Sequence, residues 1–232
     1  MGFSKIGIIG AMVEEIELLH QHVELSQKSV KAGITYYEGN LHGKPVIYCK
    51  SGVGKVNAAV CTQVLLDLGA DCVLFTGVAG AVDPQLNIGD IVVSSSCLQH
   101  DMDCSPLGFA RGVIPFNARS EFTADERLVR LASDAASKLF EGRSLTGKVL
   151  SGDQFIASRE AVKELYEQFQ GACAEMEGAS VAQVCDMNDT PFVIIRSMSD
   201  KADGSAHVNF AEFTVTASNN SYQIIDEMLK QM

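Results

Sequence analysis

The chain alternates between short apolar runs and longer segments in which apolar residues recur every three to four positions. The short runs, rich in β-branched residues, predict strands, and the longer segments predict amphipathic helices. This alternation is typical of an α/β fold, and we expect a single three-layer α/β/α domain over residues 1–232, with helices flanking a central mixed sheet. Strands are expected at Lys5–Met12, Ile34–Glu38, Pro45–Ser51, Val73–Val78, Asp90–Ser94, Gly147–Ser151, Ala174–Met176 and Pro191–Ser199.

Helix boundaries are suggested by side chains that can cap a first turn. Thr123 with Glu126, and Asn209 with Glu212, each match the capping-box spacing that opens a helix. The second pair would begin the last helix of the chain. Helices are expected at Val13–Val23, Gly54–Leu68, Thr123–Phe140, Ser158–Phe169, Ala179–Met187 and from Asn209 toward the carboxyl end.

The second of these helices carries apolar residues at fourfold spacing. Val56, Val60, Val64 and Leu68 recur every four positions. Such spacing keeps side chains near one face of a helix, so we expect a buried stripe there.

Composition narrows the classes of partner. The chain has 232 residues, 47% of them hydrophobic and 20% charged, which is ordinary for a globular protein. A net charge of −11 argues against nucleic acid, because binding to phosphates relies on Lys and Arg. No signal-peptide pattern and no apolar stretch near the roughly 18 residues of a membrane span are present. We therefore expect a cytoplasmic protein with no membrane partner.

Neither the cysteines nor the histidines predict a metal site. The seven cysteines are odd in number and form no C-x-x-C pair, so free buried thiols in a reducing compartment are expected. His100, Asp101 and Asp103 lie together, but the chain has five histidines and no second cluster to complete a coordination sphere. A hydrogen-bonded loop is the better interpretation of this cluster.

Polar residues follow apolar runs at five places, and these places are the candidates for a functional site. The carboxyl ends of parallel strands gather functional groups at one edge of a sheet. The five motifs are Gly10–Glu15, Ser51–Lys55, Thr76–Gly80, Glu175–Glu177 and Arg196–Asp200.

The glycines in two of these motifs do not predict a nucleotide triphosphate or dinucleotide site. Ser51–Lys55 resembles a phosphate loop, but Cys49 and Val56 occupy positions where the Walker pattern needs Gly and a hydroxyl residue. Thr76–Gly80 lacks the spacing of a dinucleotide fold. Its small residues would admit either a flat ligand or a closely packed helix.

Three acidic residues at strand ends indicate acid–base chemistry. Glu175 and Glu177 are two apart in a segment that we expect to be extended, which would point both carboxylates to one side. Asp200 ends a strongly apolar run, where desolvation could raise its pKa and make it a proton donor. Each carboxylate alone is better explained as a helix cap or surface charge. Together they favour a catalytic site.

In their order along the chain, these motifs resemble the 5'-methylthioadenosine/S-adenosylhomocysteine nucleosidase family, a branch of the purine nucleoside phosphorylase fold. The resemblance extends over essentially the whole chain. The matching segments are Ile6–Met12, Glu15, Lys50–Lys55, Thr76–Gly77, Gly89–Val93, His100–Asp101, Ser151–Ile156, Glu175–Glu177 and Arg196–Asp200.

The resemblance implies hydrolysis of the N-glycosidic bond of methylthioadenosine and S-adenosylhomocysteine, and also of 5'-deoxyadenosine, without a metal or organic cofactor. The reaction yields adenine and a thioribose product, and it serves methionine salvage and methyl-cycle recycling. By the same resemblance, Glu15 activates the attacking water and Asp200, supported by Ser199, protonates N7 of adenine. Glu177 holds the ribose hydroxyls.

The resemblance also implies which residues contact the nucleoside. Phe155 would stack on adenine, the backbone of Ile156 would meet its Watson–Crick edge, and Met176 would lie against the sugar. The 5' substituent would be lined by Met12, Val53 and Phe210, and the other implied contacts are Val78, Glu175 and Arg196.

Three alternatives differ in chemistry. A phosphorylase needs cationic groups for phosphate, typically Arg, and the chain has none before Arg111, whereas it has Glu15 there. A futalosine-type nucleosidase would place a large polar group where Met12, Val53 and Phe210 favour an apolar thioether. A ligand sensor without catalysis would not need a proton donor together with a water-activating carboxylate.

The segment Asp101–Pro115 predicts a homodimer. It is too apolar for a free loop and too irregular for a core element. The family resemblance implies that Cys104, Leu107 and Pro115 reach across to complete the partner's 5' pocket, although the family often carries Val and Phe at the first two places. The alternative is that the segment packs on its own subunit.

Overall fold

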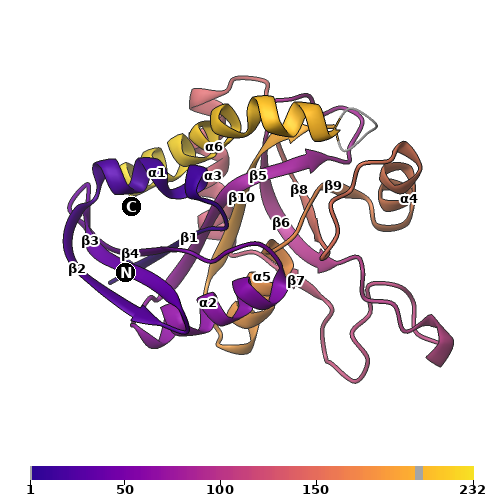
Figure 1. Cartoon of the computed structure of the whole chain (residues 1–232), viewed down its shortest axis with the longest axis horizontal. Coiled ribbons are helices and arrows are strands. Elements are labelled where there is room, and N and C mark those ends of the chain that lie inside the picture. Colours follow the sequence, from indigo (N-terminus) through magenta and orange to yellow (C-terminus); the bar gives the residue numbers. More distant parts are fainter. Residues whose placement is uncertain (1, 202–205) are drawn as a thin grey trace.

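The computed structural model describes residues 2–201 and 206–232 and shows the expected α/β arrangement of a mixed sheet between helices (Figure 1). The strands are β1 Ile6–Gly10, β2 Glu24–Lys31, β3 Ile34–Leu41, β4 Lys44–Lys50, β5 Cys72–Ala81, β6 Ile91–Gln99, β7 Glu121–Thr123, β8 Ser144–Ser151, β9 Gly171–Glu175 and β10 Phe192–Asp200. The helices are α1 Val13–His22, α2 Lys55–Asp67, α3 Glu126–Leu139, α4 Arg159–Phe169, α5 Gly178–Met187 and α6 Ala206–Gln231, with a short 3-10 turn, η1, at Ser105–Leu107.

The sheet closes partly on itself. Strands β10, β6, β8, β9 and β5 are neighbours in that order, and β10 also pairs with β5, so these five form a barrel-like ring. From β5 the sheet continues through β1, β4 and β3 to the edge strand β2. Strands β1, β5 and β10 run parallel, and the short β9 runs antiparallel to the last residues of β5. Because Gly80 of β5 pairs with both Ala174 of β9 and Asp200 of β10, the carboxyl ends of these strands and of β1 meet in one region.

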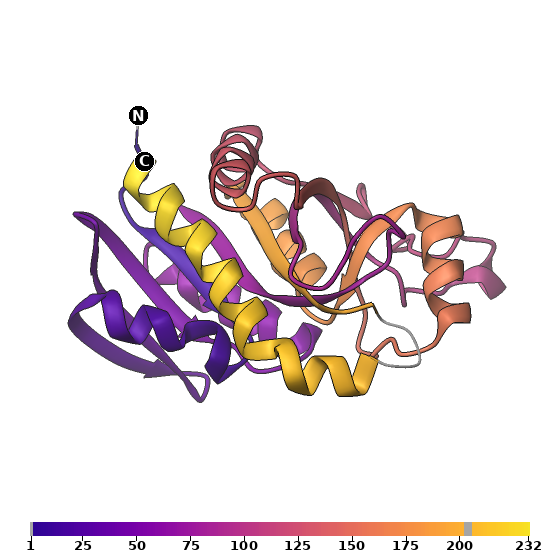
Figure 2. The same cartoon turned by 90° about the horizontal axis from the view of Figure 1, so that it is seen from above.

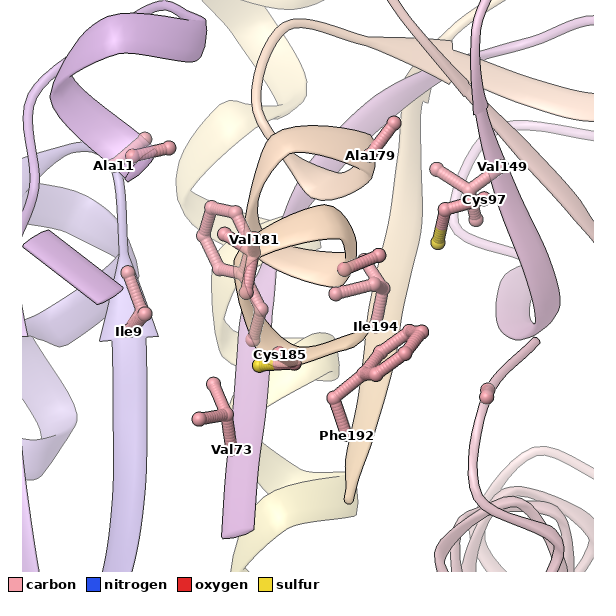
Figure 3. Packing of buried hydrophobic residues seen from close by; sticks show 14 of the residues in the cluster. Ile9, Ala11, Val73, Cys97, Val149, Ala179, Val181, Cys185, Phe192 and Ile194 are labelled. Atoms are coloured by element: carbon pink, nitrogen blue, oxygen red, sulfur yellow. The ribbon is translucent and has the colours of Figure 1, made fainter. Parts of the chain in front are cut away.

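Two helical layers bury opposite faces of this sheet. Helices α1, α3 and α6 cover one face, and α2 with α5 cover the other, as the two views show (Figures 1 and 2). Adjacent residues of β1 illustrate the alternation, because Ile8 packs with the first layer and Ile9 with the second. Figure 3 shows how Val181 and Cys185 of α5 pack with Phe192 and Ile194 of β10 in the core between the sheet and helices α2 and α5.

The predicted stripe on α2 is wrong in its first half, although Val64 and Leu68 pack partly buried against the core. Val56 is 74% exposed and Val60 is also exposed, whereas the buried face contains Ala58, Cys61 and Leu65. Helix α2 is apolar on nearly every side, so periodicity alone does not select the face that packs inward. Small residues on the Ala58 face let the helix approach the sheet closely, which decides its orientation.

Three other expectations about elements need correction. Strand β2 was not predicted, because its residues are mostly polar and exposed at the sheet edge. Helix α3 begins at Glu126 with Asp125 as its cap, since the Asp125 side chain accepts from the Leu128 N–H. Thr123 belongs instead to β7. Helix α6 begins at Ala206, so Asn209 and Glu212 do not start it.

The cysteines are free thiols, as expected. Six are buried, and Cys104 alone of the seven is partly accessible. Cys104 lies in the segment between β6 and β7, which projects from the body of the molecule at the lower right of Figure 1. Within the described residues no helix combines the length and apolar character required to cross a membrane.

Candidate active site

A cavity of about 320 Å³ lies where the carboxyl ends of β1, β5, β9 and β10 meet. It brings together residues that are as much as 199 positions apart in the sequence, from Ala11 to Phe210. Its lining residues are Ala11, Met12, Glu15, Val53, Val78, Ala79, Gly80, Gln154, Phe155, Ile156, Ala174, Glu175, Met176, Glu177, Ser199, Asp200 and Phe210.

Glu15 is held in the cavity wall by backbone groups. It lies in the first turn of α1, and its Oε2 accepts from the N–H groups of Ala11 at 2.6 Å and Met12 at 3.0 Å. Its Oε1 accepts from the Val78 N–H on β5 at 3.0 Å. Burial raises the pKa of Glu15 above its usual value, although Arg196 and these three donors oppose the shift. The carboxyl group is therefore fixed in orientation and poised to bind a proton.

Arg196 lies behind the cavity and does not line it. Its side chain is 1% exposed, its Nη2 donates to Glu175 Oε2 at 2.5 Å, and its guanidinium lies 4.0 Å above the Phe75 ring. Burial would lower the pKa of Arg196, but Glu175, Glu15 and Glu177 outweigh it and raise the pKa. In this structure Arg196 therefore acts on the site as a buried positive charge.

Both carboxylate oxygens of Glu175 accept hydrogen bonds from other groups of the protein. Besides Arg196, it accepts from the Ser151 hydroxyl and from the Gly178 N–H, at 2.8 and 2.9 Å to its two oxygens. The expected extended geometry from Glu175 to Glu177 is wrong: β9 ends at Glu175, and Glu177 has ψ −41° as the residue before α5. Because the chain turns into α5 between them, the two carboxylates have different hydrogen-bond partners.

Glu177 has fewer partners and a strongly perturbed pKa. Its Oε1 accepts from the Gly54 N–H, just before α2, at 2.8 Å. Burial first, and then the nearby Glu175 carboxylate, raise the pKa of Glu177 to about 8 against the opposing charge of Arg196. Three carboxyl groups thus share the field of one buried guanidinium, and in a low-dielectric site they do not all ionise easily.

Asp200 lies at the carboxyl end of β10 and is 2% exposed. Its Oδ2 accepts from the Ser199 hydroxyl at 2.8 Å, and that hydroxyl also lies 3.4 Å from the Ala79 carbonyl on β5. Both residues line the same cavity as Glu15 and Glu177. The cavity therefore contains carboxyl groups carried by α1, by the turn before α5 and by β10, which is an arrangement that can divide proton donation and proton acceptance between them.

The rest of the cavity wall is mostly apolar. Phe155 is 50% exposed and meets Phe210 edge to face, with ring centroids 5.7 Å apart. Met12, Val53 and Met176 also line the cavity. A flat aromatic ligand and an apolar substituent can both be accommodated by such walls.

Four residues predicted to contact substrate do not line this cavity: Arg196, Cys104, Leu107 and Pro115. The last three belong to the projecting segment between β6 and β7 (Figure 1). Among the described residues, no group of three or more His, Cys, Asp or Glu side chains could hold a metal ion.

Some supporting residues were missed by sequence reasoning. Ser221 of α6 donates to the Ile195 carbonyl, exchanges a 2.7 Å hydrogen bond with Thr76 and accepts from the Gly77 N–H next to Val78. No sequence pattern predicts that Ser221 contacts Thr76, because the two residues are 145 positions apart. Ala11, Ala79, Gly80 and Gln154 also line the cavity, and they fall inside or beside motifs already recognised, so proximity to those motifs was the available signal.

Comparison with known proteins agrees with this geometry. Residues 5–230 match the model of the phosphorylase superfamily. The chain therefore belongs to that superfamily, and its mixed sheet between helices agrees with this assignment.

Relatives define the family more closely. A 5'-methylthioadenosine/S-adenosylhomocysteine nucleosidase of Geobacillus kaustophilus is 41% identical over 230 residues, which cover 98% of this chain and 97% of that protein. The Neisseria meningitidis nucleosidase of the same name, solved with methylthio-immucillin-A, has a TM-score of 0.94 and 38% identity, covering 99% and 100% of the two chains. The chain belongs to the 5'-methylthioadenosine/S-adenosylhomocysteine nucleosidase family, as the sequence resemblance predicted.

A second activity is found among similar structures. The futalosine hydrolase of Helicobacter pylori has a TM-score of 0.93 and 35% identity, covering 99% of this chain and 98% of that one. The fold alone therefore does not separate these two kinds of nucleoside hydrolysis.

Proposed function

We propose that this protein hydrolyses the N-glycosidic bond of 5'-methylthioadenosine and S-adenosylhomocysteine, and also of 5'-deoxyadenosine. The products are adenine and the corresponding 5-thioribose, or 5-deoxyribose from the last substrate. The observation that carries the proposal is one apolar cavity that contains Glu15, Glu177 and the Ser199–Asp200 pair. Family relatives that bind methylthio-immucillin-A support the same substrate class.

Asp200 is the proposed general acid. Adenine is a poor leaving group until it is protonated, so a proton delivered to N7 lowers the barrier to cleavage. Ser199 fixes one carboxyl oxygen of Asp200 by its 2.8 Å hydrogen bond, which limits rotation of the group. Asp200 thus presents its proton in a fixed direction from a buried strand end.

Glu15 is the proposed base that activates water. Its buried carboxylate is anchored by three backbone N–H groups, so it accepts the proton of the water without moving. As the glycosidic bond stretches, positive charge develops on the ribose, and nearby carboxylates stabilise that charge. A separate acid and base follow the logic of inverting glycosidases.

Glu177 is the proposed ligand of the ribose hydroxyls, with Met176 against the sugar. In its carboxylate form Glu177 can accept hydrogen bonds from two hydroxyls, and those donors would favour this form against its raised pKa. The Gly54 N–H donates to its Oε1. Phe155 would stack on adenine while the Ile156 backbone meets the edge of the base. Met12, Val53 and Phe210 would surround the 5' substituent, with Val78 in the cavity wall.

A phosphorolytic reaction is disfavoured by the charges in the wall. No Arg or Lys is among the residues that line the described cavity, and Arg196 behind it is paired with Glu175. A phosphate ion would meet the four carboxyl groups of Glu15, Glu175, Glu177 and Asp200 instead. Futalosine hydrolysis is disfavoured because its large polar 5' group would lie against Met12, Val53 and Phe210.

We also propose a cytoplasmic homodimer of one-domain subunits. The free buried thiols are typical of a reducing compartment. Two exposed apolar side chains are Val56 on α2 and Met187 at the end of α5, a helix that packs against α2. Leu107 and Phe116 in the projecting segment are 71% and 95% exposed. A two-fold contact would cover these side chains and bring Cys104, Leu107 and Pro115 to the partner's cavity.

The function is tested by incubating the protein with methylthioadenosine, with and without phosphate, and separating the products by chromatography. We expect equal adenine release in both buffers and free thioribose as the other product. Formation of 5-methylthioribose 1-phosphate in the phosphate buffer would support a phosphorylase instead. Faster release of hypoxanthine from futalosine than of adenine from methylthioadenosine would support the second nucleosidase activity.

A further inference from the structure

Three residues from distant parts of the chain close a ring of hydrogen bonds beside the cavity. The Lys55 Nζ donates to Asp101 Oδ1 at 2.7 Å, and the Asp153 N–H donates to Asp101 Oδ2 at 3.0 Å. The Lys55 N–H then donates to Asp153 Oδ1 at 2.8 Å. Lys55 opens α2, Asp101 follows β6 and Asp153 follows β8, and none of them lines the cavity.

The Lys55–Asp101 ion pair of this ring is largely shielded from water, whereas Asp153 is exposed. The side chains of Lys55 and Asp101 are 18% and 14% exposed, so their ion pair is screened less than a surface pair. Burial opposes ionisation of Asp101, but the Lys55 and Asp153 donors outweigh it and hold its pKa below the usual range. Asp101 therefore stays ionised at neutral pH.

The ring is connected to both halves of the proposed nucleoside site. Asp153 immediately precedes the cavity-lining residues 154–156, which include the base-stacking Phe155. Within the described chain, residues 154–157 make no backbone–backbone hydrogen bond, so this turn is held by its ends and by the packing of Phe155 and Ile156. On the other side, Lys55 follows Gly54, whose N–H holds Glu177.

We propose that Asp101 is a positioning residue for nucleoside binding. Through Lys55 and Asp153 it fixes the turn that carries Phe155, and it fixes the start of α2 that aims Glu177, without touching the ligand. This inference rests on the proposed function, because the turn can position a stacking residue only if a nucleoside base binds in the cavity. Loss of the ring should weaken binding of the base more than it slows the chemical step.

The test compares Asp101→Asn, Lys55→Met and the double variant with the unaltered protein. The amide of Asp101→Asn keeps the size of the side chain, but its NH₂ group cannot accept from Lys55 or Asp153. We expect about a tenfold rise in the adenine dissociation constant and in KM, with kcat within about threefold. Calorimetry gives the adenine affinity independently of turnover. The double variant should bind no more weakly than either single one, because all three break the same ring.

Glu38→Gln is the matched control. It removes the 2.8 Å ion pair between Lys5 and Glu38, which is also partly exposed but lies away from the cavity. This variant should retain normal adenine affinity. If Asp101→Asn and Lys55→Met both bind adenine as tightly as the unaltered protein, or if their effects simply add, the inference is overturned.

Hydrogen exchange separates this inference from the proposed function. Peptides covering residues 152–158 should exchange faster in Asp101→Asn than in the unaltered protein, whatever the substrate is. Unchanged exchange there would refute the positioning role. If the unaltered protein neither binds adenine nor releases it from methylthioadenosine, the proposed function fails, while the exchange result still decides whether Asp101 holds the turn.

Discussion

At the scale of single residues, Asp200 has the most specific proposed role. Asp200→Asn keeps the shape and the acceptor for Ser199 but cannot deliver a proton to N7. We expect kcat to fall by about 10²–10⁴-fold, while binding of methylthioadenosine changes little. Steady-state kinetics with substrate binding measured by calorimetry checks both parts. Asp226→Asn, on α6 away from the cavity, should retain full turnover, and an Asp200→Asn variant within threefold of normal would exclude the role.

Glu177 predicts a pH dependence of folding stability. Its pKa is about 8 in the folded protein and near the ordinary value of 4.5 when unfolded, so the folded state binds the extra proton between these values. The stabilisation is complete below pH 4.5 and is lost as the pH rises through about 8. One such group changes the free energy of unfolding by at most about 1.4 kcal/mol per pH unit. Urea unfolding of Glu177→Gln at constant protein concentration should show a shallower decline from pH 5 to 9, whereas parallel curves would contradict the shift.

Individual site residues were predictable to different degrees. Glu15, Glu177 and Asp200 follow strands in recognisable motifs, and the structure places all three in one cavity. Arg196 belongs to the same motifs, yet a strand position does not reveal whether a side chain turns toward the cavity or behind it. Ser151 on β8 and Arg196 on β10 could not be predicted as partners of Glu175, because these contacts depend on how distant strands are paired.

At the scale of elements, close approach of β5 to α1 sets the position of Glu15. A Cβ atom on Gly77 would lie 2.5 Å from Glu15 Oε1 and 3.0 Å from Arg196 Nη1. Gly77→Ala should therefore displace the proposed base, reducing kcat at least tenfold, and destabilise the fold by about 1–3 kcal/mol. Kinetics and urea unfolding measure the two effects.

Gly171→Ala is a suitable control for that prediction. Its Cβ would meet the Leu150 side chain at 2.3 Å, so it also crowds a buried strand, but without contacting a carboxylate of the site. It should lose comparable stability while retaining more turnover. Equal turnover in the two alanine variants would mean that Gly77 has no special relation to Glu15.

The elements themselves were mostly predictable, and the failures have physical causes. Periodicity located β5 and β10 because they are buried on both faces and strongly apolar, and it located only the buried half of β8. It missed β2, whose exposed polar side chains are stabilised as a strand by pairing with β3 rather than by their own pattern. It also misplaced the buried face at the start of α2, because apolar residues on several sides of this helix do not indicate which side packs inward.

At the scale of the whole molecule, the projecting segment predicts that assembly and activity are linked. Leu107→Asp places a charge on a side chain that is 71% exposed in one subunit, so it should fold normally. If the segment covers the partner's 5' pocket, this variant should self-associate more weakly and show a raised KM for methylthioadenosine, by about tenfold. Sedimentation velocity and kinetics at matched concentrations test this.

The control for assembly lies at the other end of the molecule. Val30 on the edge strand β2 is similarly exposed, and β2 and the projecting segment lie at opposite ends in Figure 1. Val30→Asp should change neither self-association nor KM. A fully active monomer of the unaltered protein at assay concentration would contradict the shared-site arrangement. One-domain organisation likewise stays a prediction, supported by the continuity of the sheet from β10 to β2.

The distribution of thiols gives the molecule a built-in chemical reporter. Because six cysteines are enclosed and Cys104 alone is partly accessible, a maleimide dye should attach at a single position in the folded protein. That position lies on the segment proposed to enter the neighbouring subunit, so labelling should slow as protein concentration favours assembly. Mass spectrometry of the labelled peptide would locate the dye, and its rate of attachment would follow association without any engineered substitution.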